Sequence, residues 1–412
     1  MNALLEYLRE NVRWLSAGVV LTFLSSFGQT FFISLFAGEI RGEFGLSHGE
    51  WGGIYALGTT TSAVAMVWAG ALTDRLRVRA LGAGVLVMLT GACFLMAANS
   101  TVWILPVVIF ALRFSGQGMM SHLAVVAMAR WFVATRGRAL AIVGLGFSVG
   151  EAMLPLLVVA LMTVIEWRLI WVGAGLIAIC GLPLLLKLLA QERTPQAMSK
   201  SGQAEGMEHR HWTRKQALRH WLFWFMVPAL LGPAAFSTAF FFNQVHFAEI
   251  KGWHHLELVA LFPFFSLVAV GAMIVFGGAL DRLGTGRLMP WYQVPMIAAF
   301  IFFSQASTPA GAFLGLFMMG VSAGANATLV PAFWAEYYGT RNIGSIKAAA
   351  AAIMVLGSAI GPGVTGVFID LGVSLDTQYL GVAVYFAIAS ALVYVGISRA
   401  MPLLPARGVT PV

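Results

Sequence analysis

Twelve long apolar stretches dominate this chain of 412 residues and limit what it can fold into. Each stretch is close to the roughly 20 residues that a helix needs to cross a lipid bilayer. They cover residues 14–36, 51–73, 80–98, 103–129, 139–165, 169–186, 221–245, 258–280, 288–306, 310–335, 348–369 and 379–398. Because the stretches are continuous, they predict helices and not the alternating strands of a membrane barrel. We therefore expect an all-α membrane protein with twelve transmembrane helices.

The composition agrees with this expectation. Charged residues make up 10% of the chain, against about 25% in soluble proteins. So few charges cannot cover a water-exposed surface, which excludes a soluble enzyme, a disordered chain and a DNA-binding protein. The two cysteines, Cys93 and Cys180, lie inside apolar stretches and form neither a disulfide framework nor a metal-ligand pattern. We expect no metal and no cofactor.

The distribution of positive charge predicts the orientation in the membrane. If the N-terminus is cytoplasmic, 21 of the 25 Lys and Arg residues fall on the cytoplasmic side, and only Arg41, Arg168 and Lys251 fall outside. Such an excess is the positive-inside pattern of membrane proteins. The net charge of +8 is therefore a signal of topology and not of nucleic-acid binding. No cleavable signal is evident, and we expect a multi-pass protein of a bacterial-type inner (plasma) membrane with both termini cytoplasmic.

Tryptophans near the ends of these stretches are predicted to anchor the helices at the membrane surface, where an amphipathic ring is favoured. They are Trp51, Trp103, Trp131, Trp167, Trp221 and Trp291.

One long polar segment divides the chain into two halves. It covers residues 191–219 and separates an N-terminal bundle of six helices (1–190) from a C-terminal bundle of six (220–412). We expect it to be a cytoplasmic linker, mobile at 194–207 and helical at the membrane interface at 212–219. The halves are a parallel repeat at an offset of 207 residues. This offset pairs Gly45 with Gly252, Gly70 with Gly277, Asp74 with Asp281, Arg75 with Arg282, Gly150 with Gly357 and Pro155 with Pro362. Such repeats place a substrate site between the halves, near the middle of the bilayer.

Two loops and one helix resemble the signatures of the major facilitator superfamily. The sequence Gly70-Ala-Leu-Thr-Asp74-Arg75-Leu-Arg77-Val-Arg79 is similar to the family's loop between helices two and three, although Arg77 replaces a usual glycine. The second half repeats this loop from Gly277 to Arg287. Arg113-Phe-Ser-Gly-Gln117-Gly118 resembles the family's helix-four motif. The resemblance covers the whole chain and implies a secondary transporter that works by alternating access.

A narrower resemblance is to the branch that transports monocarboxylates and exchanges oxalate for formate. Residues 130–138 and 338–347 look like the corresponding loops of that branch, which implies a small organic anion as substrate. The branch commonly carries a basic residue in helix eight or eleven, but residues 258–280 and 348–369 contain none. The prediction of an anionic substrate therefore depends on Arg113.

Arg113 and Glu151 are the only two Asp, Glu, Lys or Arg residues in the central parts of the predicted spans. A buried charge costs at least about 2.5–3.5 kcal/mol, so a functional role is the first hypothesis. Arg113 is expected about 15 Å from the outer end of its helix and Glu151 about 18–21 Å from the outer end of the next, so the two could face each other. They could form a structural ion pair that clamps the helices. Alternatively, a substrate carboxylate could compete for Arg113 while Glu151 carries a coupled proton, which resembles the Arg–Glu couple of proton-coupled sugar symporters.

Further polar residues at mid-span depth are candidates for binding substrate, although for each taken singly an interhelical hydrogen bond is the more common role. They are Gln117, Gln29, Asn326, Tyr55 and Ser237. His122 falls on the face opposite Arg113 and is interpreted as a packing residue more readily than as a proton relay. Phe236, Phe240, Phe241 and Phe242 could line an apolar wall or face lipid.

The repeated loops are predicted to form a conformational latch. A carboxylate near a helix N-terminus is stabilised by the helix dipole, so Asp74 and Asp281, with Arg75 and Arg282, could hold the cytoplasmic ends of the two halves together.

Two G-x-S-x-G motifs, around Ser148 and Ser322, would indicate a hydrolase only on a strand–turn–helix elbow. Here they lie inside apolar stretches, where small residues allow close packing.

We therefore predict a transporter and not an enzyme. It would move a small organic anion, in particular a monocarboxylate, by proton symport with alternating access. Its partners would be the anion, the proton and the lipid bilayer, with no nucleic acid, and we expect a monomer. Three alternatives remain: an exporter or antiporter of an apolar or cationic compound, an intramembrane serine hydrolase built on Ser148 or Ser322, and a sensor that binds ligand without transporting it.

Overall fold

The computed structural model describes residues 2–70, 72–132, 135–191, 205–339 and 341–404. Side chains are described for these residues except 2–5, 67, 74, 75, 129, 130, 136, 137, 281, 344 and 345. Within the described residues the regular structure is helical throughout, and no strand is present.

The helices follow the apolar stretches closely. The α-helices are α1 (Asn2–Leu24), α2 (Thr30–Ile33), α3 (Ala37–Phe44), α4 (His48–Ala69), α5 (Leu72–Arg75), α6 (Val78–Ala98), α7 (Leu105–Leu112), α8 (Ser121–Trp131), α9 (Arg136–Met162), α10 (Trp167–Leu188), α11 (Arg214–Arg219), α12 (Trp221–Phe242), α13 (Gln244–Ile250), α14 (His255–Val259), α15 (Phe262–Leu283), α16 (Thr285–Leu288), α17 (Val294–Gln305), α18 (Pro309–Tyr338), α19 (Ile343–Asp370) and α20 (Leu375–Ala400). The 3₁₀ turns are η1 (Ser25–Gly28), η2 (Ser34–Phe36), η3 (Val102–Ile104), η5 (Met207–His209), η6 (Met289–Trp291) and η7 (Met401–Leu403), whereas η4 (Arg113–Met120) is a π-helix.

Nine helical segments in the described residues are long and apolar enough to cross a membrane, and the bent pair Glu6–Gly28 and Thr30–Phe44 makes a tenth. The remaining two predicted spans correspond to α4, which carries four glycines and three threonines, and to α17, which has 12 residues. The surfaces of the spans are apolar, as on α15, where Leu267, Ile274 and Val275 are 69%, 68% and 69% exposed. Such surfaces suit lipid because a helix satisfies its own backbone hydrogen bonds.

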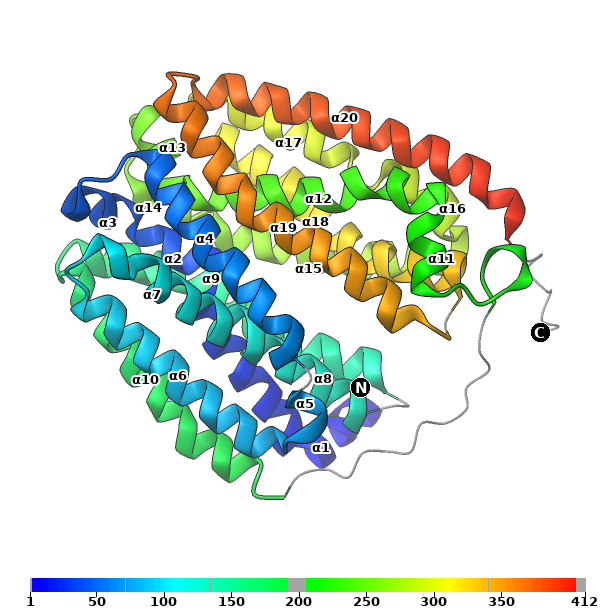
Figure 1. Ribbon diagram of the computed structural model, residues 1–412, viewed down its shortest axis with the longest axis horizontal. Helices are drawn as coiled ribbons and strands as arrows, with labels where there is room; N and C mark the ends of the chain where they lie inside the picture. Colours follow the sequence, from blue (N-terminus) through cyan, green and yellow to red (C-terminus); the bar gives the residue numbers. More distant parts are fainter. Residues whose placement is uncertain (1, 71, 133–134, 192–204, 340, 405–412) are drawn as a thin grey trace. The chain divides into compact units, whose positions relative to one another are not determined.

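The chain forms two compact units. Unit 1 contains Met1–Ser199, Phe240–Pro263 and Pro362–Asp370, and unit 2 contains Lys200–Ala239, Phe264–Gly361 and Leu371–Val412. In unit 1, α6 packs along α10 and α1 packs along α9. In unit 2, α17 packs between α18 and α20, and Figure 1 shows α20 running beside α17. The expected division at residues 190 and 220 stays a prediction.

The repeat at an offset of 207 residues extends to local backbone structure. Gly45 and Gly252 both adopt positive φ angles, 63° and 69°, a conformation that glycine reaches without a steric penalty. Two residues later, capping boxes start α4 and α14 with the pairs Ser47–Glu50 and His254–Glu257, again 207 apart. Each box satisfies backbone N–H groups that have no partner inside the helix. The same chain reversal is therefore encoded in both halves.

A proline in α12 frees a carbonyl that two side chains then bind. Pro233 has no N–H, so the oxygen of Ala229, four residues earlier, loses its helical donor. The side-chain amide of Gln293 and the hydroxyl of Tyr292 donate hydrogen bonds to that oxygen. Both side chains are almost fully buried, so the break in α12 is satisfied from the turn between η6 and α17.

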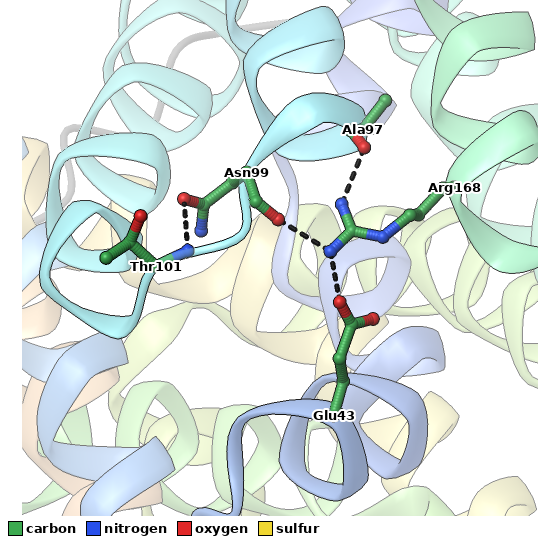
Figure 2. A network of polar contacts seen from close by, with 5 residues as sticks. All are labelled: Glu43, Ala97, Asn99, Thr101 and Arg168. Carbon is green, nitrogen blue, oxygen red and sulfur yellow. Dashed lines mark hydrogen bonds and ion pairs between the residues drawn. The ribbon is translucent and has the colours of Figure 1, made fainter.

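Arg168 joins three helices at one end of unit 1, as Figure 2 shows. Its guanidinium donates to the carbonyl oxygens of Ala97 and Asn99, each at 2.6 Å, at the end of α6, and forms an ion pair with Glu43 on α3. The last carbonyls of a helix have no donor inside it, and Arg168 supplies one from α10.

The tryptophan prediction is only partly right. Trp103 and Trp291 are exposed, but Trp51, Trp131 and Trp167 are buried within the protein. Trp51 stacks on Phe242, and Trp167 lies against Phe36. A position near the end of a span fixes the depth of a ring but not which side of the helix faces lipid.

Candidate functional site

The first span breaks at Gln29. The chain passes from η1 into α2 through an extended residue, with φ −86° and ψ 155° at Gln29, and the two parts of the span are bent by 45°. The break interrupts the regular helical hydrogen bonds near the middle of the span, so that the Gly28 oxygen accepts a hydrogen bond from a side chain instead. Non-helical backbone at membrane depth is tolerated only inside the protein or along a cavity, and such broken spans often form transport sites.

The fourth span is irregular at the same place. It begins as α7, continues as the π-helix η4 from Arg113 to Met120, and ends as α8. Gly116 of η4 lies against Gly28 of η1, where a β-carbon on Gly116 would approach the Gly28 Cα to 2.6 Å. Only two glycines allow the backbones to come this close. The π-helix and the broken helix therefore meet directly, and π-helical turns frequently mark functional sites.

Arg113 extends from the π-helix toward the break. Its Nη1 donates to the backbone oxygen of Gly28 at 3.3 Å and to Oγ1 of Thr30 at 3.1 Å. Its guanidinium carbon lies 5.4 Å from the centre of the Tyr55 ring, within range of a cation–π interaction. The side chain is 1% exposed. Its Nε and Nη2 have no hydrogen-bond partner among the described residues.

Tyr55 connects this arginine to an aromatic group. The Tyr55 and Thr30 hydroxyls are 2.5 Å apart, so Thr30 contacts both Arg113 and Tyr55. The Tyr55 ring packs at 4.6 Å from Phe242, which also stacks on Trp51. The predicted site residue Tyr55 is thus beside Arg113. The sequence pattern does not reveal the Gly28 carbonyl and Thr30 as partners of Arg113.

Gln29 also belongs to this group. It is 7% exposed, and its amide lies 3.5 Å from the hydroxyl of Ser121, the first residue of α8. Gln117, another predicted binding residue, is exposed, and none of the hydrogen bonds of Arg113 with described residues involves it.

The expected contact between Arg113 and Glu151 is not present. None of the hydrogen bonds or ion pairs that Arg113 makes with the described residues is to Glu151. The reason is that η1 lies between the two helices. Gly116 packs on Gly28, and Gly150, next to Glu151 on α9, packs on Ser26. Glu151 is half-buried and has interactions of its own. Equal depth in the membrane did not imply contact, because the first span occupies the space between.

The family is decided by comparison with known proteins. The model of the Major Facilitator Superfamily matches residues 18–362. The chain belongs to the Major Facilitator Superfamily. No curated protein matches it.

Two solved structures share the fold. A bacterial homologue of the human lysosomal transporter Spinster, in an inward-facing and unoccupied conformation, has 15% sequence identity and a TM-score of 0.73, with 96% of this chain and 98% of that chain covered. The nucleoside transporter NupG has 13% identity and a TM-score of 0.69, with 93% and 98% covered. The predicted all-α, twelve-helix fold of a multi-pass membrane protein is confirmed. The protein is a transporter of small molecules and not an enzyme.

Membership of the superfamily agrees with the packing of the two G-x-S-x-G serines. Ser148 is on α9, between Gly146 and Gly150, which pack on α1 and η1. Ser322 is on α18 and donates to the backbone oxygen of Tyr292. Neither lies on the strand–turn–helix elbow of a hydrolase.

The other predicted binding residues lie in unit 2. Asn326 is on α18 and Ser237 is on α12, and both are half-buried. Phe236 packs in unit 2 against Phe300 and Tyr385. Phe240, Phe241 and Phe242 are buried, so these three rings do not face lipid.

The role of the two superfamily loops as a conformational latch stays a prediction. Asp74 and Arg75 end the short helix α5, and the side chains of Asp74, Arg75 and Asp281 lie outside the described residues. Arg282, at the end of α15, is exposed. His122 lies beside Gly70, at the end of α4. This position agrees with its interpretation as a packing residue.

Proposed function

We propose that this protein is a secondary transporter of small organic anions, in particular monocarboxylates, and that Arg113 binds the substrate carboxylate. Tyr55, Thr30 and Gln29 would complete this part of the site. The residues Asn326, Ser237 and Gln117 stay candidates for contacts with the rest of the substrate.

The observation that carries the proposal is the free edge of the Arg113 guanidinium. Nη1 binds Gly28 and Thr30, whereas Nε and Nη2 have no partner among the described residues. The N–H groups of Nε and Nη2 point in the same direction and fit the two oxygens of one carboxylate. A buried donor without a partner costs about 1–3 kcal/mol, and more when it is charged. A carboxylate would remove this cost.

The same geometry favours one carboxylate over two. A single guanidinium edge is available, and Arg113 is the only Lys or Arg inside the central parts of the predicted spans. The rings of Tyr55 and Phe242, both buried, give the charge apolar surroundings. A small anion with one carboxylate and a short apolar part would match this combination.

We further propose that Glu151 carries the coupled proton. Glu151 is half-buried in the fifth span, on a helix that packs against η1, the element that also binds Arg113. A proton on Glu151 would compensate the negative charge of the substrate anion during transport. Arg113 and Glu151 would both act on the broken first span, so substrate binding and protonation would be coupled through this segment.

Ligand-dependent stability tests the binding role. Purified protein in detergent is heated with a panel of monocarboxylates and with the matching neutral amides. A ligand that binds only the folded state raises the unfolding midpoint. We expect at least one carboxylate to raise it, its amide to have no effect, and Arg113→Lys to abolish the shift. Arg9→Lys, at an exposed position of α1, is the matched control and should keep it.

Proteoliposomes test the proton role separately. Glu151→Gln imitates the protonated form, so accumulation driven by a proton gradient should disappear while exchange of labelled substrate survives. If accumulation persists in Glu151→Gln, Glu151 is not the proton carrier. If neither carboxylates nor their amides shift the midpoint and a cationic or apolar compound does, the protein belongs to the exporter or antiporter class.

A further inference from the structure

The segment just before α12 is docked on unit 2 by specific contacts. The backbone N–H of Trp212 donates to the Tyr338 oxygen at 3.1 Å, at the end of α18, and the Asn342 amide donates to the Trp212 oxygen at 3.1 Å. Met207 and Trp212 are buried. The described part of the predicted linker, from residue 205 onward, is therefore held against the bundle and is not a free tether.

The short helix α11 follows directly and lies across the end of a membrane span. A capping box of Thr213 and Gln216 starts it, and the extended residue His220 ends it. Figure 1 shows α11 crossing the end of α12 at a steep angle. The Trp224 indole in the first turn of α12 donates to the Leu218 oxygen at 2.9 Å, which joins the two helices at their corner. Because α12 is long and apolar enough to cross a membrane, we expect α11 to lie along the membrane surface.

One face of α11 is cationic and open. Arg214, Lys215 and Arg219 are exposed, and among the residues that the structure describes none of them has an ion-pair partner. Lys215 and Arg219 are four residues apart and share a side of the helix. Ala217, on the other side, is 1% exposed and belongs to the core of unit 2. The helix contains no acidic residue.

Trp224, at the corner between α11 and α12, indicates the depth in the membrane at which the basic face of α11 lies. Trp224 is 57% exposed although its indole N–H is bonded. Tryptophan on the surface of a span is favoured at the level of the lipid headgroups. The neighbouring basic side chains would then reach the phosphate layer of the same leaflet. This end of the bundle is also the end that the charge distribution predicts to be cytoplasmic, where anionic lipids attract basic segments.

We propose that the exposed face of α11 binds the headgroups of anionic phospholipids. Arg214, Lys215 and Arg219 would contact the phosphates, and Trp224 would fix the depth. The bound lipid would hold α11 and, through Trp212, the junction between α18 and α19. Charge complementarity favours this partner, and the exposed indole beside the patch favours a membrane surface over an acidic protein or a nucleic acid. The inference does not depend on which substrate is transported.

Lipid selectivity at the protein surface tests this inference. The full-length protein is placed in nanodiscs that contain equal amounts of phosphatidylglycerol and phosphatidylcholine. Spin-labelled phosphatidylglycerol or phosphatidylcholine is then added, and the fraction immobilised by the protein is measured. The test variant carries Arg214→Gln, Lys215→Gln and Arg219→Gln. The control variant carries Arg9→Gln, Arg13→Gln and Lys187→Gln, which removes the same charge from exposed positions of unit 1.

We expect the wild type to immobilise phosphatidylglycerol in preference to phosphatidylcholine. The preference should decline in high salt and fall in the test variant, by up to about fivefold for each charge removed. The control variant should keep most of it. Hydrogen exchange at residues 205–219 should be slower with phosphatidylglycerol present in the wild type and in the control variant, but not in the test variant.

Several outcomes would overturn the inference. Equal immobilisation of both lipids by the wild type would do so. An equal loss of preference in the test and control variants would mean that only net charge matters. If inorganic phosphate slows exchange at 205–219 as well as phosphatidylglycerol does, the face is a site for free anions. If a soluble acidic peptide protects these residues in nanodiscs and phosphatidylglycerol does not, the partner is a protein.

Discussion

The carboxylate of Asp370, the last residue of α19, accepts a hydrogen bond from the Ser47 hydroxyl at 2.8 Å. The same carboxylate accepts the backbone N–H groups of His48 at 3.1 Å and Gly49 at 2.7 Å, at the start of α4. A negative charge at the N-terminus of a helix is stabilised both by these donors and by the helix dipole. Asp370 therefore ties the last turn of α19 to the first turn of α4 within unit 1.

Removing this carboxylate should weaken the tie. Asp370→Ala loses three hydrogen bonds to one helix end, and loss of such a cap costs about 0.5–2 kcal/mol. We expect a lower midpoint of thermal unfolding in detergent and faster labelling of a cysteine placed at position 53 of α4, where a β-carbon meets nothing within 4 Å. Glu39→Ala, an exposed acid on α3, should change neither. A wild-type midpoint with unchanged labelling in Asp370→Ala would show that the tie contributes nothing.

A pair of histidines next to this tie should make the structure sensitive to acid. The rings of His48 and His246 are 4.2 Å apart. Burial, followed by the nearby His246 and Arg41, lowers the pKa of His48 from 6.5 to about 4, and Asp370 acts in the opposite direction. Burial also lowers the pKa of His246, where Arg41 acts in the same direction and Glu249 in the opposite one.

The direction in which stability changes with pH follows from proton linkage. Below pH 6.5 the opened or unfolded chain protonates these rings more readily than the packed structure does, so stability is complete above pH 6.5 and falls toward pH 4. We expect the unfolding midpoint of the wild type to fall over this interval more steeply than that of His48→Gln. The exposed His209→Gln is the control and should follow the wild type. Parallel profiles of the wild type and His48→Gln would contradict the prediction.

Arg168 should be needed for stability and not for substrate binding. It donates to the backbone oxygens at the end of α6 and pairs with Glu43. Arg168→Gln leaves these oxygens short of a donor, which costs about 1–3 kcal/mol. We expect a lower unfolding midpoint, with the midpoint shift produced by a bound carboxylate unchanged. Loss of that shift in folded Arg168→Gln would instead place Arg168 in the binding site.

The sequence predicts the helices well because each apolar stretch is a local property of about 20 residues. It also predicts Arg113 as a functional residue, because a charge in a span is costly and conspicuous. The pairing of Gly45 with Gly252 follows from the repeat, and Ser47–Glu50 fits the capping-box pattern, whereas His254–Glu257 forms the same box without a serine or threonine.

The partners of Arg113 could not be predicted in the same way. Depth along a helix places Arg113 and Glu151 at one level, but which helix lies between them is a property of packing. The contact with Gly28 depends on a break at Gln29 and on a π-helix, and neither has a distinct sequence pattern here. Similarly, Trp51 and Trp167 are at span ends, yet their rings pack inward because aromatic neighbours surround them.

Transport by Arg113→Lys tests the central claim most directly. The variant keeps the positive charge but loses the two-pronged edge that fits a carboxylate. Exchange of a labelled monocarboxylate across proteoliposome membranes, chosen as the compound that most stabilises the wild type, is measured for the wild type, Arg113→Lys and Arg9→Lys. We predict about a 10–100-fold loss in Arg113→Lys, as expected for losing charge-assisted hydrogen bonds worth about 1.5–3 kcal/mol each, and no loss in Arg9→Lys. Wild-type exchange by a folded Arg113→Lys, or full uptake by the double variant Arg113→Met with Glu151→Gln, would contradict the claim that Arg113 binds the substrate.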